Sequence, residues 1–384
     1  MSGSATSTTN TSLMTPAVVR SKVRQLATFL DADEAKKANS AGNLQGTSNT
    51  NVVSQKDYET FRQMIGNASE QVEQQSNKVA LGWKSMRNDE ERHGLLQALM
   101  QQAELVFTCT FLMTTSQGLC CAAARDEITY AAKQISASID VMMELLERSD
   151  AIDKQAFMPE IAQKCGAVWE ACKGVRLVAK SNRAATKRKL MRSIRTIKDT
   201  HDEFEDMVKN AREKDSSATN NDDDDDDVNT GNSANISGGE PEIGSDEWYA
   251  MMDELGEEES MDETDCERVE NGLEVVRTTG RVLQNAAKTV GSVEPWRGDN
   301  EKISYVSWLD QIAIAASQIE KAITQLGVNM YPPLDEDVII NTTQNVRAAS
   351  KGLIDAINSA SVPLAEPDTK ALDDLQATLS SMKI

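Results

Sequence analysis

Apolar residues recur at alternating steps of four and three along most of the chain after residue 54. One such series is Ile128, Ala132, Ile135, Ile139, Met142 and Leu146, and others run over 161–179 and 190–211. Side chains at this spacing share one face of an α-helix, so each helix has one apolar stripe to bury. No alternating strand pattern of useful length occurs. The pattern predicts an all-α fold.

The breaks between these series divide the chain into helices and two bundles. Five long helices are predicted at 55–87, 90–117, 123–148, 155–180 and 183–213, and four more at 262–292, 300–327, 335–361 and 368–383. Helices with a near-3.5 repeat pack at shallow angles, as in coiled coils and antiparallel bundles. We expect a five-helix bundle over 54–213 and a four-helix bundle over 262–384. Residues 1–53 are expected to be mostly disordered, with a short helix within 18–38.

Charge is concentrated in one segment between the predicted bundles. The formal net charge is −21, and residues 215–263 contain 18 acidic and no basic residues, so the rest of the chain is nearly neutral. This composition predicts an acidic, disordered linker over 214–261. Ser217, Ser245 and Ser260 lie beside or near these acids, which makes them candidate phosphorylation sites. Added phosphate would increase the repulsion and extend the linker.

The linker contains one short amphipathic segment. Trp248, Met251, Met252 and Leu255 fall at i, i+3, i+4 and i+7, and Tyr249 is adjacent. This spacing is typical of a helix that enters a partner's groove, so these five residues are candidate partner contacts. Docking on the protein's own bundle and residual order in a disordered tail are the alternatives.

A basic stripe precedes the linker. Ten basic and no acidic residues occur from Lys173 to Lys198, and we name four of them the basic stripe: Lys187, Arg188, Arg192 and Arg195. It is either a solvated helix face or an acceptor for acidic ligands, including an intramolecular clamp with the aspartates at 222–227. Nucleic-acid binding is not expected, because the chain is acidic and the stripe lacks interleaved aromatic residues for stacking.

Catalytic motifs are missing. The sequence has no GxGxxG, Gly-Lys, HExxH, GxSxG or CxxC, so neither an enzymatic activity nor a cofactor or metal is expected. The six cysteines are interpreted as reduced, mostly buried thiols, and His201 as a core or edge histidine on an apolar stripe. The longest uncharged stretch, 105–124, is too polar for a membrane span and favours a helix buried in a bundle.

Several short matches resemble one known family. They are Val168-Trp169-Glu170-Ala171-Cys172, the stretch Lys198-Asp199-Thr200-His201-Asp202-Glu203-Phe204-Glu205, and Asn329-Met330-Tyr331-Pro332-Pro333-Leu334 after an acidic linker, while 61–83 is similar to the family's first long helix. In this order they resemble the cyclin-D-binding (cyclin-D-interacting, helix–loop–helix-type) proteins, over about residues 50–384.

The resemblance implies a non-catalytic interaction protein with two bundles akin to those of talin and vinculin. It also implies binding to D-type cyclins and to adaptor or helix–loop–helix proteins, restraint of cell-cycle progression or transcription, and a location in both nucleus and cytoplasm. The alternative is a cytoskeletal adaptor whose bundle binds actin or opens, since small or polar residues such as Gly280 and Thr342 in the apolar stripes weaken packing.

Overall fold

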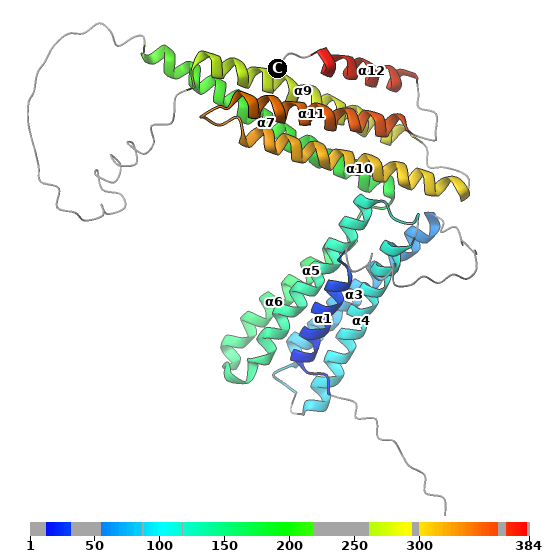
Figure 1. Ribbon diagram of the computed structural model, residues 1–384. Helices are drawn as coiled ribbons and strands as arrows, with labels where there is room; N and C mark the ends of the chain where they lie inside the picture. Colours follow the sequence, from blue (N-terminus) through cyan, green and yellow to red (C-terminus); the bar gives the residue numbers. More distant parts are fainter. Residues whose placement is uncertain are drawn as a thin grey trace, which may run out of the picture. The chain divides into compact units, whose positions relative to one another are not determined.

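The computed structural model describes residues 13–31, 55–86, 88–116, 118–218, 261–293, 299–359 and 366–381. Within these ranges the chain forms ten α-helices and one 3-10 turn, and no strand (Figure 1). The all-α prediction is therefore confirmed. The helices are α1 (Pro16–Phe29), α3 (Gln55–Gly82), α4 (Asp89–Thr115), α5 (Ala122–Glu147), α6 (Lys154–Arg176), α7 (Asn182–Ala218), α9 (Glu263–Ser292), α10 (Asp299–Val328), α11 (Glu336–Asn358) and α12 (Glu366–Ser381).

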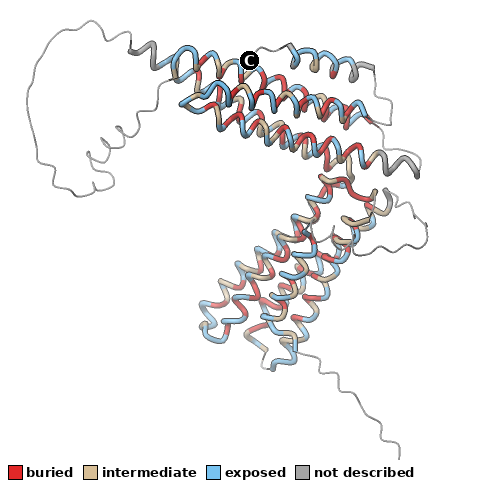
Figure 2. The backbone as a smooth tube through the Cα atoms, in the orientation of Figure 1, coloured by how far each residue is buried: buried red, intermediate tan, exposed pale blue. Residues whose placement is uncertain are grey.

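The chain divides into two compact units. The first comprises Met1–Arg188 and Glu294–Ala313, and the second comprises Lys189–Val293 and Ile314–Ile384. Each unit is a helical bundle whose buried residues lie on the inward faces of its helices (Figure 2). The predicted seams supply these residues; Ile135, Ile139 and Met142 of α5, for example, are fully buried.

In the first unit, α3 packs between α4 and α6, and α5 packs against α1, α4 and α6. Side chains of the connecting segments tie the helix ends together. The indole Nε1 of Trp83 donates to Ser149 Oγ at 2.9 Å, and the guanidinium of Arg92 stacks 5.1 Å from the same indole ring. Buried polar groups paired in this way fix the relative positions of helices that the apolar faces alone would allow to slide.

Helix α1 lies where a short helix was predicted, and it packs against the first bundle. The predicted short helix within 18–38 occupies Pro16–Phe29 and packs on α5 and α4. Its Val19 and Val23 are fully buried, and its Arg24 donates two hydrogen bonds to Asp140 of α5, at 2.7 and 2.8 Å. The short helix predicted for the N-terminal region therefore exists, and its packing on the bundle is the new finding: two valines and two arginines of α1 match a face of α5.

In the second unit, α7 runs antiparallel to α9, and α9 runs parallel to α11. Ile197 of α7 lies beside Gly280 of α9, whose absent Cβ would stand 3.5 Å from the isoleucine methyl group. Thr279 and Ser350 share a hydrogen bond of 3.2 Å between α9 and α11. Helix α12 packs on α9 and α11.

Helix α7 corresponds to the predicted helix 183–213, which was expected to belong to the N-terminal bundle. The structure assigns α7 from Lys189 onward to the second unit, with Phe204 and Ile197 buried there. The apolar stripe of a helix shows that it needs a partner but does not say which helix that partner is. Helix α7 also extends to Ala218, a few residues past the predicted start of the linker.

Candidate functional site

The linker candidates cannot be located. Trp248, Tyr249, Met251, Met252 and Leu255 lie outside the described residues, as do Ser245 and Ser260. Ser217 lies in the last turn of α7. Their proposed roles in partner binding and phosphorylation therefore stay predictions.

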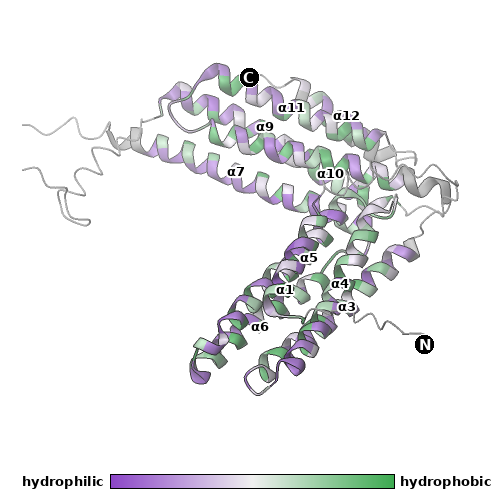
Figure 3. Ribbon diagram, turned by 60° about the horizontal axis from the view of Figure 1, so that its bottom comes forward, coloured by the Kyte–Doolittle hydropathy of each residue, from purple (hydrophilic) through white to green (hydrophobic). Residues whose placement is uncertain are grey.

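The basic stripe lies on α7, and all four of its side chains are exposed. Hydrophilic residues cover much of this helix (Figure 3). Arg188 is held within the first unit, because its guanidinium lies 3.3 Å from Glu127 and donates to the Leu177 carbonyl oxygen at 2.7 Å. Arg192 and Arg195 belong to the second unit. Arg188 therefore contributes to the contacts within its own bundle.

The length of α7 argues against a clamp between the aspartates at 222–227 and the two arginines of the basic stripe that lie nearest to them, Arg192 and Arg195. Because α7 continues to Ala218, Arg195 and Arg192 lie about 35 and 39 Å back along the helix at about 1.5 Å per residue. An extended chain gains at most about 3.6 Å per residue, so Asp222 reaches only about 14 Å from Ala218 and Asp227 about 32 Å. Most of the aspartate run therefore falls short of both arginines of the same molecule.

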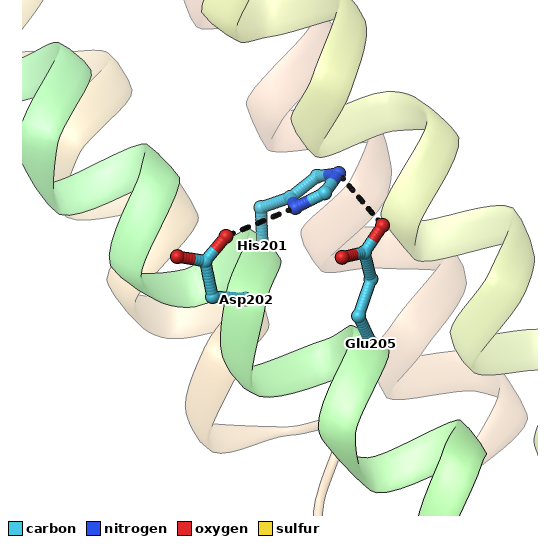
Figure 4. Close-up of side chains that lie close together, drawn as sticks. All are labelled: His201, Asp202 and Glu205. Atoms are coloured by element: carbon cyan, nitrogen blue, oxygen red, sulfur yellow. Dashed lines mark ion pairs between the residues drawn. The ribbon is translucent and has the colours of Figure 1, made fainter.

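A histidine and two carboxylates lie together on α7 (Figure 4). His201 Nδ1 is 3.5 Å from Asp202 Oδ1, and its Nε2 is 3.6 Å from Glu205 Oε1. The carboxylates face opposite ring nitrogens, whereas one metal ion can bind only one of these nitrogens. Glu205 also lies 3.6 Å from the guanidinium of Arg277 on α9, which already supplies a positive charge. The group is a polar edge of the α7–α9 contact, in keeping with the interpretation of His201 as an edge histidine.

The cysteine side chains are shielded from solvent. All six are free and buried. Burial raises the pKa of Cys121 to about 11 and that of Cys172 to about 12, so both thiols are protonated at neutral pH. Since the thiolate is the nucleophile and metal ligand, neither group is ready to act.

The first unit also exposes an apolar feature that the sequence analysis missed. We name Tyr130, Gln134, Ala137 and Val141 of α5 the uncharged strip; all four are exposed, Tyr130 by 67% and Val141 by 42%. They follow one another at i, i+4, i+7 and i+11, so one edge of α5 carries no charge over three turns. An aromatic residue within an exposed uncharged surface is typical of a protein interface. The same spacing was readable in the sequence, beside the buried series that starts at Ile128.

Residues 64–210 match the model of a family described as Grap2 and cyclin-D-interacting, N-terminal. The chain is also 21% identical over 323 residues to a zebrafish (Danio rerio) protein named Cyclin-D1-binding protein 1 homolog, and the match covers 83% of each chain. These matches confirm the resemblance to the cyclin-D-binding family. The residues matched by the family model run from α3 into α7, and include the uncharged strip and the basic stripe.

Proposed function

We propose that the protein is a non-enzymatic regulator that acts by binding other proteins, and that it restrains cell-cycle progression or transcription. The observation that carries the proposal is the match of 64–210 to the cyclin-D-interacting family. By analogy with the name of the zebrafish relative, the first partner to test is a D-type cyclin. Helix–loop–helix and adaptor proteins, which the family resemblance implies, come next. We propose a location in both nucleus and cytoplasm, which imaging of the tagged chain in cells would test.

The surface we propose for the partner is the uncharged strip on α5. Interfaces draw most of their energy from a few buried aromatic or large side chains, and Tyr130 is such a residue on an otherwise accessible edge.

No helix in the described part of the chain is long and apolar enough to span a membrane.

Binding of the full-length chain to a purified D-type cyclin tests this function. We expect saturable binding by calorimetry, and an affinity at least about tenfold weaker for the double variant Tyr130→Asp with Val141→Asp, because a charge would be buried without a partner. Met64→Asp is the matched control, since Met64 of α3 is similarly exposed, at 42%. Absence of cyclin binding would refute the partner, whereas equal loss in the control would refute the surface.

A cytoskeletal adaptor is the second candidate, and buried hydroxyl groups in the second unit favour it. Thr278, Thr279, Thr342, Thr343 and Ser350 are buried on α9 and α11, and Thr278 Oγ1 has no hydrogen-bond partner. Such contacts weaken a bundle core and make its opening easier. Cosedimentation with actin filaments tests this role, and protein left entirely in the supernatant would argue against it.

A further inference from the structure

The second unit has two facing helix edges, one on α7 and one on α9. Glu205 of α7 and Arg277 of α9 form an ion pair of 3.6 Å, which places their two edges side by side. Counting back from Glu205 by the i, i+4, i+7 rule, the edge of α7 continues through Asp202, Lys198, Arg195 and Met191. Counting forward from Arg277, the edge of α9 continues through Arg281, Gln284 and Lys288. Because the helices are antiparallel, both edges extend in the same direction from the ion pair.

Beyond the ion pair these edges are basic. We name Met191, Arg195, Lys198, Arg281 and Lys288 the basic face of α7 and α9, and all five are exposed. Met191 is 51% exposed and lies among the positive charges, beside the half-buried Ile194. The acids on the two edges lie toward the other end, where Asp202 is 3.4 Å from Lys198 and Glu205 pairs with Arg277. A cationic surface with an exposed thioether fits an acidic peptide that carries large apolar side chains.

We propose that the basic face binds the chain's own acidic amphipathic segment, residues 245–255. This segment contains four acids, Asp246, Glu247, Asp253 and Glu254, and no basic residue. As a helix it would present Trp248, Met251, Met252 and Leu255 on one side, where they would meet Met191 and Ile194 while the acids meet the surrounding arginines and lysines. Charge and apolar character are thus complementary along the same length of surface.

The chain is long enough for this contact within one molecule. Helix α9 begins at Glu263, so Arg277 lies about 21 Å and Lys288 about 38 Å along its axis. From the N-cap residue Asp262 an extended chain allows Leu255 up to about 25 Å. Residues 248–255 as a helix add about 11 Å, so Trp248 reaches up to about 36 Å. Leu255 therefore reaches the level of Arg277, and Trp248 reaches the turns beyond it.

An open depression lies on the way from the start of α9 to the basic face. It has a volume of about 400 Å³ and an apolar lining of Val208 and Leu273. Two basic residues, Lys209 and Arg212, and three glutamates, Glu205, Glu213 and Glu270, complete the lining. Between α7 and α9 it provides room for the chain that leads back from Asp262. The contact would cover the residues that the sequence assigns to partner binding, and it does not depend on which partner the protein has.

Photocrosslinking in the full-length chain tests the proposal. Tyr249 is replaced by p-benzoylphenylalanine, the purified protein is irradiated, and crosslinked peptides are identified by mass spectrometry. We expect crosslinks within one molecule to residues 191–198 and 281–288. The yield should fall about tenfold in the double variant Arg281→Glu with Lys288→Glu, since two attractive surface pairs become repulsive. It should also fall at 0.5 M salt.

Two further variants separate this contact from general charge effects. Lys351→Glu with Lys370→Glu makes the same change at exposed positions on α11 and α12 of the same unit, and should leave the yield unchanged. Adding Asp253→Lys and Glu254→Lys to the Arg281→Glu and Lys288→Glu chain should restore it. Crosslinks only between two molecules, crosslinks to other surfaces, or a yield insensitive to the reversal would each overturn the proposal, while leaving the test of cyclin binding unaffected.

Discussion

Docking of α1 onto the first bundle depends on Val23. The side chain is fully buried, the Val23 carbonyl oxygen accepts a hydrogen bond from Ser136 of α5 at 2.8 Å, and the neighbouring Arg24 pairs with Asp140. Replacing Val23 by alanine removes two methyl groups, which costs about 1.6 kcal/mol in lost burial at about 0.8 kcal/mol per group. The remaining cavity raises the cost to about 2 kcal/mol.

Alanine has the higher helix propensity and offsets about 0.5 kcal/mol, so the net loss is about 1.5 kcal/mol. At 1.4 kcal/mol per factor of ten, α1 should undock about tenfold more often. Hydrogen–deuterium exchange of the full-length chain measures this directly. We expect the amides of residues 20–29 to exchange about tenfold faster in Val23→Ala, with little change in α3.

The control is Gln25→Ala, which alters an exposed position two residues along the same helix. It should leave exchange within about twofold of the parent protein, since it removes no buried surface. If both variants exchange at the same rate, α1 is not held by Val23 and the docking described here is wrong.

Four further outcomes are expected. Hydrogen bonds from Arg24 and Arg20 lower the pKa of Asp140 despite its partial burial; protection of α1 in hydrogen exchange should therefore be constant above the ordinary carboxyl pKa of about 4 and decline as pH falls through the lower folded value. Gly166→Ala, where a Cβ meets nothing within 4 Å, should raise the free energy of unfolding by about 0.5–1 kcal/mol in urea titration. In the same titration Gly272→Ala should raise it less than Gly166→Ala does, because its Cβ would stand 2.5 Å from the terminal methyl group of Met330, which must move aside. A thiol reagent at pH 7 should modify few of the six cysteines before unfolding, and rapid modification of the native protein would contradict the raised pKa values of Cys121 and Cys172.

The positions of the helices could be predicted because the apolar repeat of four and three residues continues along each helix even where a single position is small or polar. The predicted 123–148 and 155–180 compare with Ala122–Glu147 and Lys154–Arg176. Helix α1 also carried a local signal: Thr15 caps its N-terminus by accepting from Val18 N, and Pro16 occupies the first turn. A threonine followed by proline is a common helix start. The sequence did not show that α1, a helix of 14 residues with a small apolar face, packs against α5, about 110 residues further along the chain.

The candidate sites were less predictable, for geometric reasons. A run of basic residues predicts a positive helix face, but whether Arg188 is free depends on Glu127, which lies on another helix. The distance from the aspartates at 222–227 to Arg192 and Arg195 depends on where α7 ends. Helix-end signals in the sequence give that boundary, Ala218, only to within a few residues. The basic face of α7 and α9 could not be predicted from the sequence, because it depends on the antiparallel packing of these two helices.

The region of family resemblance ends within a helix and is not a folding unit. Residues 64–210 include α7 as far as its last turns, yet α7 from Lys189 onward packs in the second unit. Ile197, Phe204 and Val208 are buried there, and Phe204 lies against Gly272 of α9, which is far outside the matched residues. A fragment cut at 210 would expose this apolar face to water. Any activity assigned to the matched region must therefore be measured in the full chain, since residues that α7 packs against, such as Gly272 and Gly280, are encoded after the acidic segment.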